Sequence, residues 1–348
     1  METTVFKFEH DMPVRNFPAP RWTGDEYRAL EKAAELLRRR ELVALPTETV
    51  YGLGGNALDP EAAGKIYAAK GRPSDNPLIV HIADCFEFYR LCAEVPDDAM
   101  TLAEKFWPDP LTMVLPKSFK VPDVTTGGLD TVAIRMPNSA VAYEMIQLAG
   151  VPVAAPSANL SGRPSPTRGD HCVKDLDGKI AMILWGEDCK VGIESTIVDL
   201  TEETPAILRP GIITPTQLSK ALGREVIIDP AILGVPDKNL RPCAPGMRYR
   251  HYAPKAPMTI FQGEPDDVRR RIETEKAKAE ADGRSVGVLL FSDDAFEEAA
   301  RDLFADLRAM DDEGVDVIFA GALKQSDERG FAVMNRMLKS AGYNVVDV

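Results

Sequence analysis

The chain is poor in the side chains that most often hold metal ions or form crosslinks. It has five cysteines and four histidines in 348 residues, without a Cys-x-x-Cys pair or two histidines close in sequence. This pattern argues against a disulfide framework and against structural zinc. No apolar run is long enough to cross a bilayer, and the first residues lack the apolar segment of a secretory signal. We therefore expect a cytoplasmic protein that makes no contact with membranes.

Positive charge is also scarce, which argues against a general nucleic-acid binder. The net charge is −13, and an acidic surface repels a phosphate backbone. Residues 213–257 are the exception, with seven basic and three acidic residues. A short basic segment between two acidic regions is typical of a linker that docks on an anionic group. The length is sufficient for two domains, and the hydrophobic content of 45% is sufficient for full cores.

The first part of the chain predicts short buried strands that do not alternate strictly with helices. A capping-box pattern begins a helix at residue 23, and further helices are expected over 59–70 and 139–149. The predicted strands cover residues 42–45, 78–82, 111–115, 132–136, 151–155, 180–185, 193–199 and 206–209. This order favours an α/β fold with a mixed, twisted sheet over a doubly wound one.

The last part of the chain has a regular alternation of strands and helices. Strands are predicted at 258–262, 286–291 and 315–320, helices at 265–282, 294–309 and 326–340, and a final strand at 343–346. This predicts a smaller, Rossmann-like parallel α/β domain with helices on both faces, although this part lacks the Gly-x-Gly-x-x-Gly fingerprint. The expected organisation is an N-terminal arm (1–23), a first domain (24–212), a basic linker (213–257) and a C-terminal domain (258–348).

Residues 68–82 carry the strongest chemical signal. Lys70 and Arg72 lie two residues apart in a loop stiffened by one glycine and two prolines, ahead of an apolar run that contains His81. Lysine supplies charge and arginine adds a planar fork of donors, so a rigid loop of this kind suits a phosphate. The alternative is a solvated basic turn.

Two further segments place glycine and small polar residues after a predicted strand. Residues 46–56 combine three glycines with Thr47 and Thr49, which would let the backbone approach a ligand closely; an ordinary tight turn is the alternative. Residues 153–167 contain Ser157 and Asn159, whose polar groups could bind an anion together with backbone N–H groups. Neither a Ser-His-Asp order nor a Gly-x-Ser-x-Gly turn is present, so Ser157 is not interpreted as a nucleophile.

Two arginines lie in or at the end of apolar strands. A buried Arg135 needs a partner, which is either a structural carboxylate or the carboxylate of a substrate. Arg209 ends another strand, whereas Ser195 and Thr196 within a strand are more often a matter of β propensity. Ligands bind where strand ends meet at one edge of an α/β sheet. The polar loops together therefore predict a site for a nucleotide and a small carboxylate.

Five motifs, in their order and spacing, resemble the YrdC-like family of threonylcarbamoyl-AMP synthases over about residues 24–212. The motifs are Pro-Thr-Glu-Thr-Val-Tyr-Gly-Leu (46–53), Lys-Gly-Arg-Pro-x-x-Asn-Pro-Leu (70–78), Ala-Pro-Ser-Ala-Asn-x-Ser-Gly (155–162), Glu-Ser-Thr-Ile-Val-Asp (194–199) and Leu-Arg-Pro-Gly (208–211). Residues 245–254 resemble the linker of the long, two-domain form. The resemblance implies a nucleotidyltransferase that converts L-threonine, bicarbonate and ATP to threonylcarbamoyl-adenylate and pyrophosphate.

The resemblance also implies roles by motif position. Lys70 and Arg72 would bind phosphate and stabilise developing charge, and Ser157 and Asn159 would face them on the ATP side. The other positions implied to contact the nucleotide are Ser74, Thr131, Ser165, Arg209 and Tyr249. Arg135 would take the carboxylate of threonine. The other positions implied to surround threonine are Thr47, His81, Ala155 and Ser195. No protein ligand for a metal is implied, and Mg²⁺ is expected with ATP and pyrophosphate, held mainly by substrate oxygens and water.

The basic linker and the partners complete this interpretation. Residues 248–252 (Arg248 to Tyr252) would fold over the site, exclude water and protect a labile adenylate. The implied partner is the complex that transfers the threonylcarbamoyl group to the adenosine beside the anticodon of certain tRNAs, with at most a weak direct contact to tRNA.

Two rival interpretations remain. The YrdC-like fold has been discussed as a double-stranded-RNA binder, but the net charge of −13 argues against that use. Hydrogenase maturation factors contain a YrdC-like part that also makes a carbamoyl-adenylate. They carry Cys-x-x-Cys zinc signals that this chain lacks.

Overall fold

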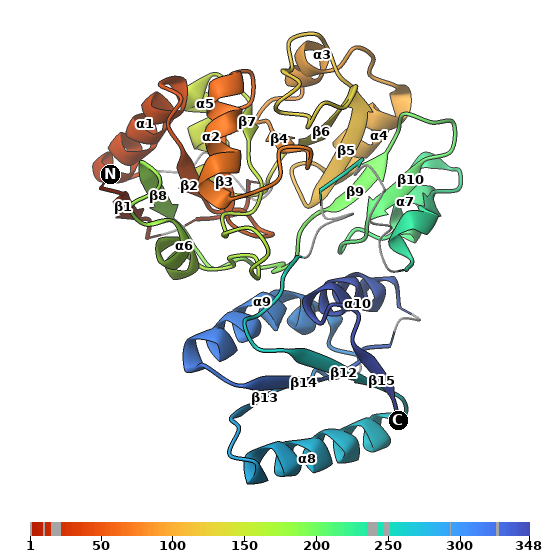
Figure 1. Ribbon diagram of the computed structural model, residues 1–348. Coiled ribbons are helices and arrows are strands. Elements are labelled where there is room, and N and C mark those ends of the chain that lie inside the picture. The colour runs from red at the N-terminus through yellow and green to blue at the C-terminus, as the bar shows by residue number, and fades with distance from the viewer. Residues whose placement is uncertain are drawn as a thin grey trace.

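The computed structural model describes residues 2–9, 11–14, 22–234, 243–245, 251–292, 294–324 and 327–348. Within these ranges the chain forms a large sheet domain and a smaller C-terminal domain, which lies below it in Figure 1. Among the described helices, none combines the length and the apolar character that spanning a membrane requires.

The large domain is built on an eleven-stranded sheet with parallel and antiparallel neighbours, as the sequence predicted. The strand order is β1-β8-β2-β3-β7-β4-β6-β5-β9-β10-β11. The strands are β1 (Thr4–Lys7), β2 (Val43–Leu45), β3 (Gly52–Asn56), β4 (Ile79–His81), β5 (Leu111–Pro116), β6 (Thr131–Arg135), β7 (Val153–Ala154), β8 (Met182–Trp185), β9 (Thr196–Asp199), β10 (Ala206–Arg209) and β11 (Ile227–Ile228).

Local sequence signals set the helix ends of this domain. The predicted capping box is present, with the N–H of Glu26 donating to Thr23 Oγ1 at 3.2 Å and the N–H of Thr23 donating to Glu26 Oε2 at 2.8 Å. Gly71 ends the second helix in the left-handed conformation at φ 64°. The helices are α1 (Gly24–Arg38), α2 (Pro60–Lys70), α3 (Glu87–Leu91), α4 (Asp97–Phe106), α5 (Ala140–Ala149), α6 (Gly169–Leu176) and α7 (Pro215–Leu222).

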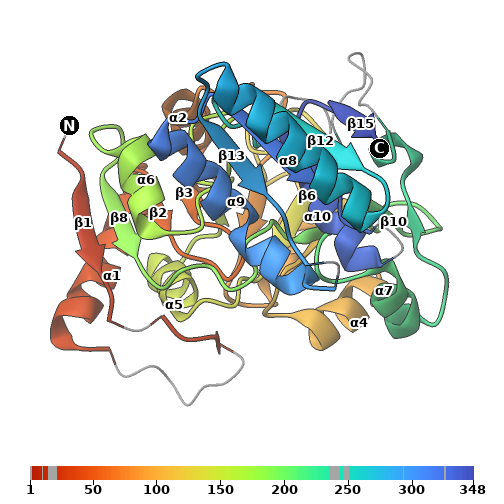
Figure 2. The ribbon, with the colours of Figure 1, turned by 90° about the horizontal axis from the view of Figure 1, so that it is seen from below.

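Two strands correct the sequence prediction. Residues expected as an extended arm form β1, which pairs in parallel with β8 at one edge of the sheet (Figure 2). Residues expected as a polar loop form β3, which pairs antiparallel with β2 and β7. Strand β3 was not predicted because its glycines have no side chains and therefore show no alternation of apolar and polar residues. Helices α3, α4, α6 and α7 were not predicted either.

Part of the segment that the sequence assigned to the linker packs on the large domain. Helix α7 begins with a capping box between Thr214 and Gln217. Strand β11 pairs in parallel with β10 and extends the sheet, followed by a 3₁₀ turn at Pro230–Ile232. Of the residues that follow, the structure describes 243–245 and those from 251 onward.

The C-terminal domain is a four-stranded, all-parallel sheet in the order β13-β14-β12-β15. Helix α8 covers one face, and α9 and α10 cover the other face, between this sheet and the large domain (Figures 1 and 2). The prediction of a small parallel sheet with helices on both faces is confirmed. The elements are β12 (Met258–Gln262), α8 (Pro265–Ala281), β13 (Val286–Leu289), α9 (Phe296–Glu313), β14 (Val317–Gly321), α10 (Glu328–Ser340) and β15 (Val345–Asp347).

One apolar core is shared between the two domains. It is built mainly from side chains of α9, α10 and the C-terminal sheet, such as Leu303 and Met337. Val50 and Ile193 of the large domain belong to the same cluster, as does Tyr252, whose ring lies 5.0 Å from that of Phe304. The domains are therefore joined by buried apolar contact, which is the main favourable term in association.

Candidate functional site

A cavity lies where several strands of the large sheet end, and it is bordered by most of the loops that the sequence singled out. The adjacent parallel strands β4 and β6 place His81 opposite Arg135 at this edge. Residues 245, 251 and 252, from the end of the linker, form part of the wall. The cavity is lined by Thr47, Thr49, Val50, Gly52, Arg72, Ile79, His81, Arg135, Ala155, Pro156, Ser157, Glu194, Arg209, Pro245, His251 and Tyr252.

Arg135 is held in a buried network at this edge. Its Nη1 donates to Thr49 Oγ1 at 2.8 Å and its Nη2 donates to Glu48 Oε1 at 2.5 Å. The partner in the ligand-free protein is thus a structural carboxylate, one of the two alternatives left open by the sequence. The Nε–H of Arg135 is buried and has no hydrogen-bond partner among the described residues. One donor of a fixed guanidinium therefore remains for a ligand.

Thr47 fixes the loop that carries these groups. Its hydroxyl donates to the carbonyl of Val50 at 2.6 Å and lies 2.9 Å from Thr49 Oγ1. Glu48 also accepts from the backbone N–H of Asn138 at 3.0 Å. The loop is consequently a preorganised support for Arg135.

His81 is a neutral side chain in this wall. Burial, assisted by the nearby Arg135 cation, lowers the pKa of His81 to about 3. Its Nδ1–H donates to the carbonyl of Ile79 at 3.2 Å, which fixes the orientation of the ring. His81 therefore presents an uncharged imidazole beside the arginine.

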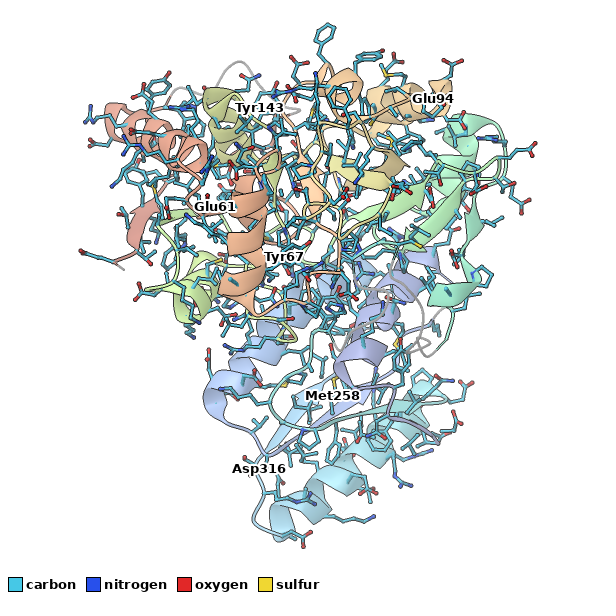
Figure 3. The ribbon with its side chains drawn as sticks, turned by 45° about the horizontal axis from the view of Figure 1, so that its top comes forward. Glu61, Tyr67, Glu94, Tyr143, Met258 and Asp316 are labelled. Carbon is cyan, nitrogen blue, oxygen red and sulfur yellow. The ribbon has the colours of Figure 1, made fainter. Side chains whose placement is uncertain are left out.

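Lys70 lies at the end of α2, which runs from Glu61 past Tyr67 toward the C-terminal domain (Figure 3). Its ammonium group donates to the carbonyls of Ser157 and Asn159. Burial, followed by the nearby Arg72 cation, lowers the pKa of Lys70 well below its usual value. The two segments predicted to face each other do so, and a buried cation joins them.

Arg72 and Ser157 extend this cationic edge into the cavity. The guanidinium of Arg72 donates to the carbonyls of Asn76 at 3.2 Å and Pro77 at 2.9 Å. Ser157 Oγ donates to Asn159 Oδ1 at 2.5 Å. These bonds hold the loop in one shape, as expected for a site that must fix an anion.

Arg209 and Ser195 form a second buried pair. The Nε–H of Arg209 donates to the Ser195 carbonyl at 2.9 Å, and Nη2 donates to Ser195 Oγ at 3.0 Å. Thr112 Oγ1 lies 2.8 Å from the same hydroxyl. Burial lowers the pKa of Arg209 to about 10. Arg209 lines the cavity, whereas Ser195 supports it from behind.

Glu194 is a functional candidate that sequence reasoning did not single out. It is the acidic side chain among the described residues that line the cavity. Its Oε1 accepts from Ser165 Oγ at 2.7 Å, and its Oε2 accepts from Nε of Arg336 in the C-terminal domain at 3.1 Å. The available signal was its place in the Glu-Ser-Thr-Ile-Val-Asp motif, immediately before a buried strand.

The remaining residues predicted for the site differ in whether they line the cavity. Ala155 lines the cavity and its N–H donates to the Ile79 carbonyl at 2.9 Å. Ser74 is exposed, and Thr131 begins β6 at the end away from Arg135; neither lines the described cavity. Tyr249, with Arg248 and Arg250, lies outside the described residues.

The donor set around the cavity does not form a protein-only metal site. No group of three or more histidine, cysteine or acidic side chains with metal-binding geometry occurs in the described ranges. Glu194 is already bonded to Ser165 and Arg336. The residues present fit a metal that arrives on phosphate oxygens better than one held by side chains.

Comparison with known proteins matches both domains. A family described as "Telomere recombination" matches residues 35–211, and "Threonylcarbamoyl-AMP synthase, C-terminal domain" matches residues 213–342. The threonylcarbamoyl-AMP synthase of Pyrococcus abyssi is 49% identical over 326 residues, which covers 91% of this chain and 95% of the relative. The Bacillus subtilis enzyme of the same name is 44% identical over 334 residues, with 91% and 94% coverage.

Solved structures of similar proteins agree with the sequence matches. The crystal structure of P. abyssi Sua5 complexed with L-threonine has a TM-score of 0.90 at 46% identity, and covers 99% of this chain and 100% of that one. A P. abyssi Sua5 variant with a His and a Tyr replaced by Ala has the same TM-score at 45% identity, covering 99% of this chain and 98% of that one. The chain therefore belongs to the family of threonylcarbamoyl-AMP synthases, in the form that joins a YrdC-like domain to a Sua5 C-terminal domain.

Proposed function

We propose that the cavity is the site at which this chain joins L-threonine, bicarbonate and ATP into threonylcarbamoyl-AMP and pyrophosphate. The observation that carries the proposal is one continuous wall. It includes Arg135, whose Nε–H is buried and unpaired among the described residues, and Arg72 of the Lys70–Arg72 loop. A carboxylate and a phosphate chain are the two anionic parts that such a wall would hold.

Threonine would bind at Arg135. Its carboxylate would accept from the unpaired Nε–H of Arg135, which Glu48 and Thr49 already hold in place. Thr47, His81, Ala155 and Ser195 complete the proposed threonine positions. The P. abyssi relative was crystallised with L-threonine, which supports threonine as the substrate.

ATP would bind with its phosphates on the Lys70–Arg72 loop. Ser157 and Asn159 lie on the carbonyl-lined turn that Lys70 holds. The remaining proposed contacts to the nucleotide are Ser74, Thr131, Ser165, Arg209 and Tyr249. Lys70 and Arg72 would be the catalytic residues, because they stabilise the charge that develops on the phosphates.

The reaction needs no protein nucleophile. The amine of threonine combines with bicarbonate to give a carbamate and water. A carbamate oxygen then attacks the α-phosphorus of ATP, a new P–O bond forms, and the bond to the departing pyrophosphate breaks. The residues bind, orient and neutralise charge, and those contributions are sufficient for a displacement at phosphorus.

We also propose that Mg²⁺ takes part, bound to the phosphate oxygens of ATP and to water, where it would neutralise negative charge. The linker would close the site from the other side. His251 lines the cavity with a buried Nε2 that has no partner among the described residues. Such a group would meet the bound intermediate and keep water from it.

In this proposal residues 24–212 form the catalytic site, residues 213–257 close over the site and residues 258–348 support it. The product would pass, in the cytoplasm, to the enzyme complex that modifies the adenosine beside the anticodon of tRNA. Direct contact with tRNA would be weak, because the net charge is −13.

The test is pyrophosphate release from ATP by the purified full-length chain, with bicarbonate and Mg²⁺ and with L-threonine, L-serine or no amino acid. We expect release that depends on threonine, and Lys70→Ala should lower its rate by about 100-fold or more. Lys65→Ala is the matched control, since Lys65 lies on the same helix and pairs with Glu41 at the surface. Its rate should equal that of the wild type.

Two results would contradict the proposal. Folded protein that releases no pyrophosphate with any amino acid would refute the synthase assignment and would make titration with RNA the next experiment. Equal losses in Lys70→Ala and Lys65→Ala would remove the loop from the mechanism. Gel filtration after the same reaction tests the linker, because His251→Ala should retain less of the intermediate.

A further inference from the structure

A fully buried arginine of the C-terminal domain reaches the wall of the cavity. Arg336 lies on α10, which faces the large domain in Figure 1, and its side chain is 0% exposed. Its Nε–H donates to Glu194 Oε2 at 3.1 Å, and its Nη2 donates to the Glu194 carbonyl at 3.2 Å. Its Nη1 donates to the carbonyl of Pro210. All three groups that it reaches in the large domain lie at the ends of strands that border the cavity.

These bonds join the two backbone segments on either side of the Ser195–Arg209 pair. Glu194 and Ser195 lie directly before β9, and Pro210 follows Arg209, the last residue of β10. The same segments touch again one residue later, where a Cβ on Gly211 would lie 2.5 Å from the N atom of Thr196. Arg336 therefore joins two strand ends that carry Arg209, which lines the cavity, and Ser195, to which Arg209 donates.

The carboxylate that Arg336 holds is itself the centre of a small network. Glu194 Oε1 accepts from Ser165 Oγ at 2.7 Å. Burial, followed by the nearby Glu194 carboxylate, raises the pKa of Tyr252, so this tyrosine of the linker is neutral beside the network. Burial alone would raise the pKa of Glu194, but the Arg336 and Arg209 cations hold it below its usual value. The Glu194–Arg336 ion pair thus connects Ser165, which is proposed to contact the nucleotide, with the C-terminal domain, and Tyr252 of the linker lies near it.

We propose that Arg336 is a positioning residue of the synthase site: through its fork of donors it holds Glu194 and the Pro210 carbonyl, and so places Ser165, Arg209 and Tyr252 around the nucleotide. The C-terminal domain thereby completes the ATP side of a site that it does not itself contain. The alternative is that Arg336 only compensates a buried charge, without any influence on geometry. The proposal rests on the proposed function, and the experiment separates the two.

The experiment measures kcat and the KM values for ATP and for L-threonine by pyrophosphate release in full-length variants, together with thermal unfolding. Arg336→Met should raise the KM for ATP by roughly tenfold or more while the KM for threonine changes much less. Arg336→Lys keeps the charge but cannot bridge two carbonyls and a carboxylate in the same plane. It should recover stability and leave the KM for ATP raised.

Lys174→Met is the matched control for contact between the domains. Lys174 pairs with Asp312 across the same interface at 2.5 Å, but both side chains are about half exposed. Removal of the Lys174–Asp312 ion pair should change neither the KM for ATP nor the KM for L-threonine. A wild-type chain without threonine-dependent release would refute the proposed function, whereas an active wild type and an Arg336→Met variant with unchanged KM for ATP would refute this inference alone.

A double variant keeps the test decisive if Arg336→Met does not fold. Glu194→Gln removes the charge that Arg336→Met would leave buried and unpaired, so the double variant should be more stable than Arg336→Met. A raised KM for ATP in the stable double variant would support positioning. Normal KM for ATP in that variant would show that Arg336 only compensates charge, and would overturn the proposal.

Discussion

Burial determines the charge states of the side chains around the cavity. The pKa of His251, like that of His81, is lowered to about 3, first by burial and then by a nearby cation, Arg72 for His251 and Arg135 for His81. Both imidazoles are consequently neutral at physiological pH, and the positive charge of the cavity rests on its arginines. Neutral imidazoles suit the proposed function of the cavity, in which a carbamate would be oriented without receiving a proton from a histidine.

The depressed histidine pKa gives stability a defined pH dependence. An unfolded histidine takes up a proton below about pH 6.5, whereas folded His81 does so only near pH 3. Between these values the unfolded state binds more protons, so the free energy of unfolding falls as the pH is lowered. Asp11 acts in the opposite direction below about pH 6, because burial raises its pKa to about 6.

We expect His81→Gln to reduce the slope of unfolding free energy against pH by about 1.4 kcal/mol per pH unit, between about pH 6.5 and pH 4.5. The amide of glutamine can still donate to the Ile79 carbonyl, so the wall should be kept. Urea unfolding at several pH values in this interval measures the slope. A slope equal to that of the wild type would show that His81 is not neutral in the folded protein.

At the scale of the element, β3 shows why glycine was misread in the sequence. Its glycines suggested a ligand-binding loop, yet they allow a strand to pass between close neighbours. A Cβ on Gly54 would lie 2.7 Å from Leu45 Cδ2 and 2.9 Å from Val153 Cγ1. Gly52 does line the cavity, so one glycine of the strand borders the site and another serves the packing.

Gly54→Ala should therefore destabilise the protein by about 1–3 kcal/mol, the usual cost of overpacking a core. Gly64→Ala is the control, because Gly64 lies within α2 and a Cβ there meets nothing within 4 Å. That change should stabilise the protein by about 0.5–1 kcal/mol, since alanine favours a helix over glycine. Denaturant unfolding measures both, and equal effects of the two substitutions would contradict the packing argument.

The sequence predicted elements and single residues better than it predicted pairs. Strands rich in β-branched residues, the capping box at residue 23 and the buried Arg135 each carry a local signal, and they were predicted. The capping box that begins α7 was overlooked. The partners Glu48 and Glu194 were not found, because their bonds join residues 87 and 142 positions apart. Arg336 lies on an amphipathic helix where a charged residue normally faces solvent, so only the packing of the domains shows its burial.

At the scale of the whole molecule, the site depends on how closely the domains approach. The loop that leads to Glu194 meets the backbone of α9 at Gly192. A Cβ on Gly192 would lie 2.3 Å from the Cα of Arg301 and 2.4 Å from the carbonyl oxygen of Ala300. Its φ of +79° is also a conformation that other residues rarely adopt. No side chain fits at this point without separating the domains.

Gly192→Ala should therefore weaken the contact between the domains, lower the thermal stability and expose the linker to limited proteolysis. The backbone of α9 cannot yield as a flexible side chain would, so the change must be absorbed by movement of the domain that carries Arg336. Gly150→Ala separates this effect from backbone strain alone. Gly150 has a φ of +63° but open space around a Cβ, so its replacement should cost only about 1–2 kcal/mol and leave the cleavage pattern unchanged. If both variants resist the protease as the wild type does, the approach at Gly192 does not hold the domains together.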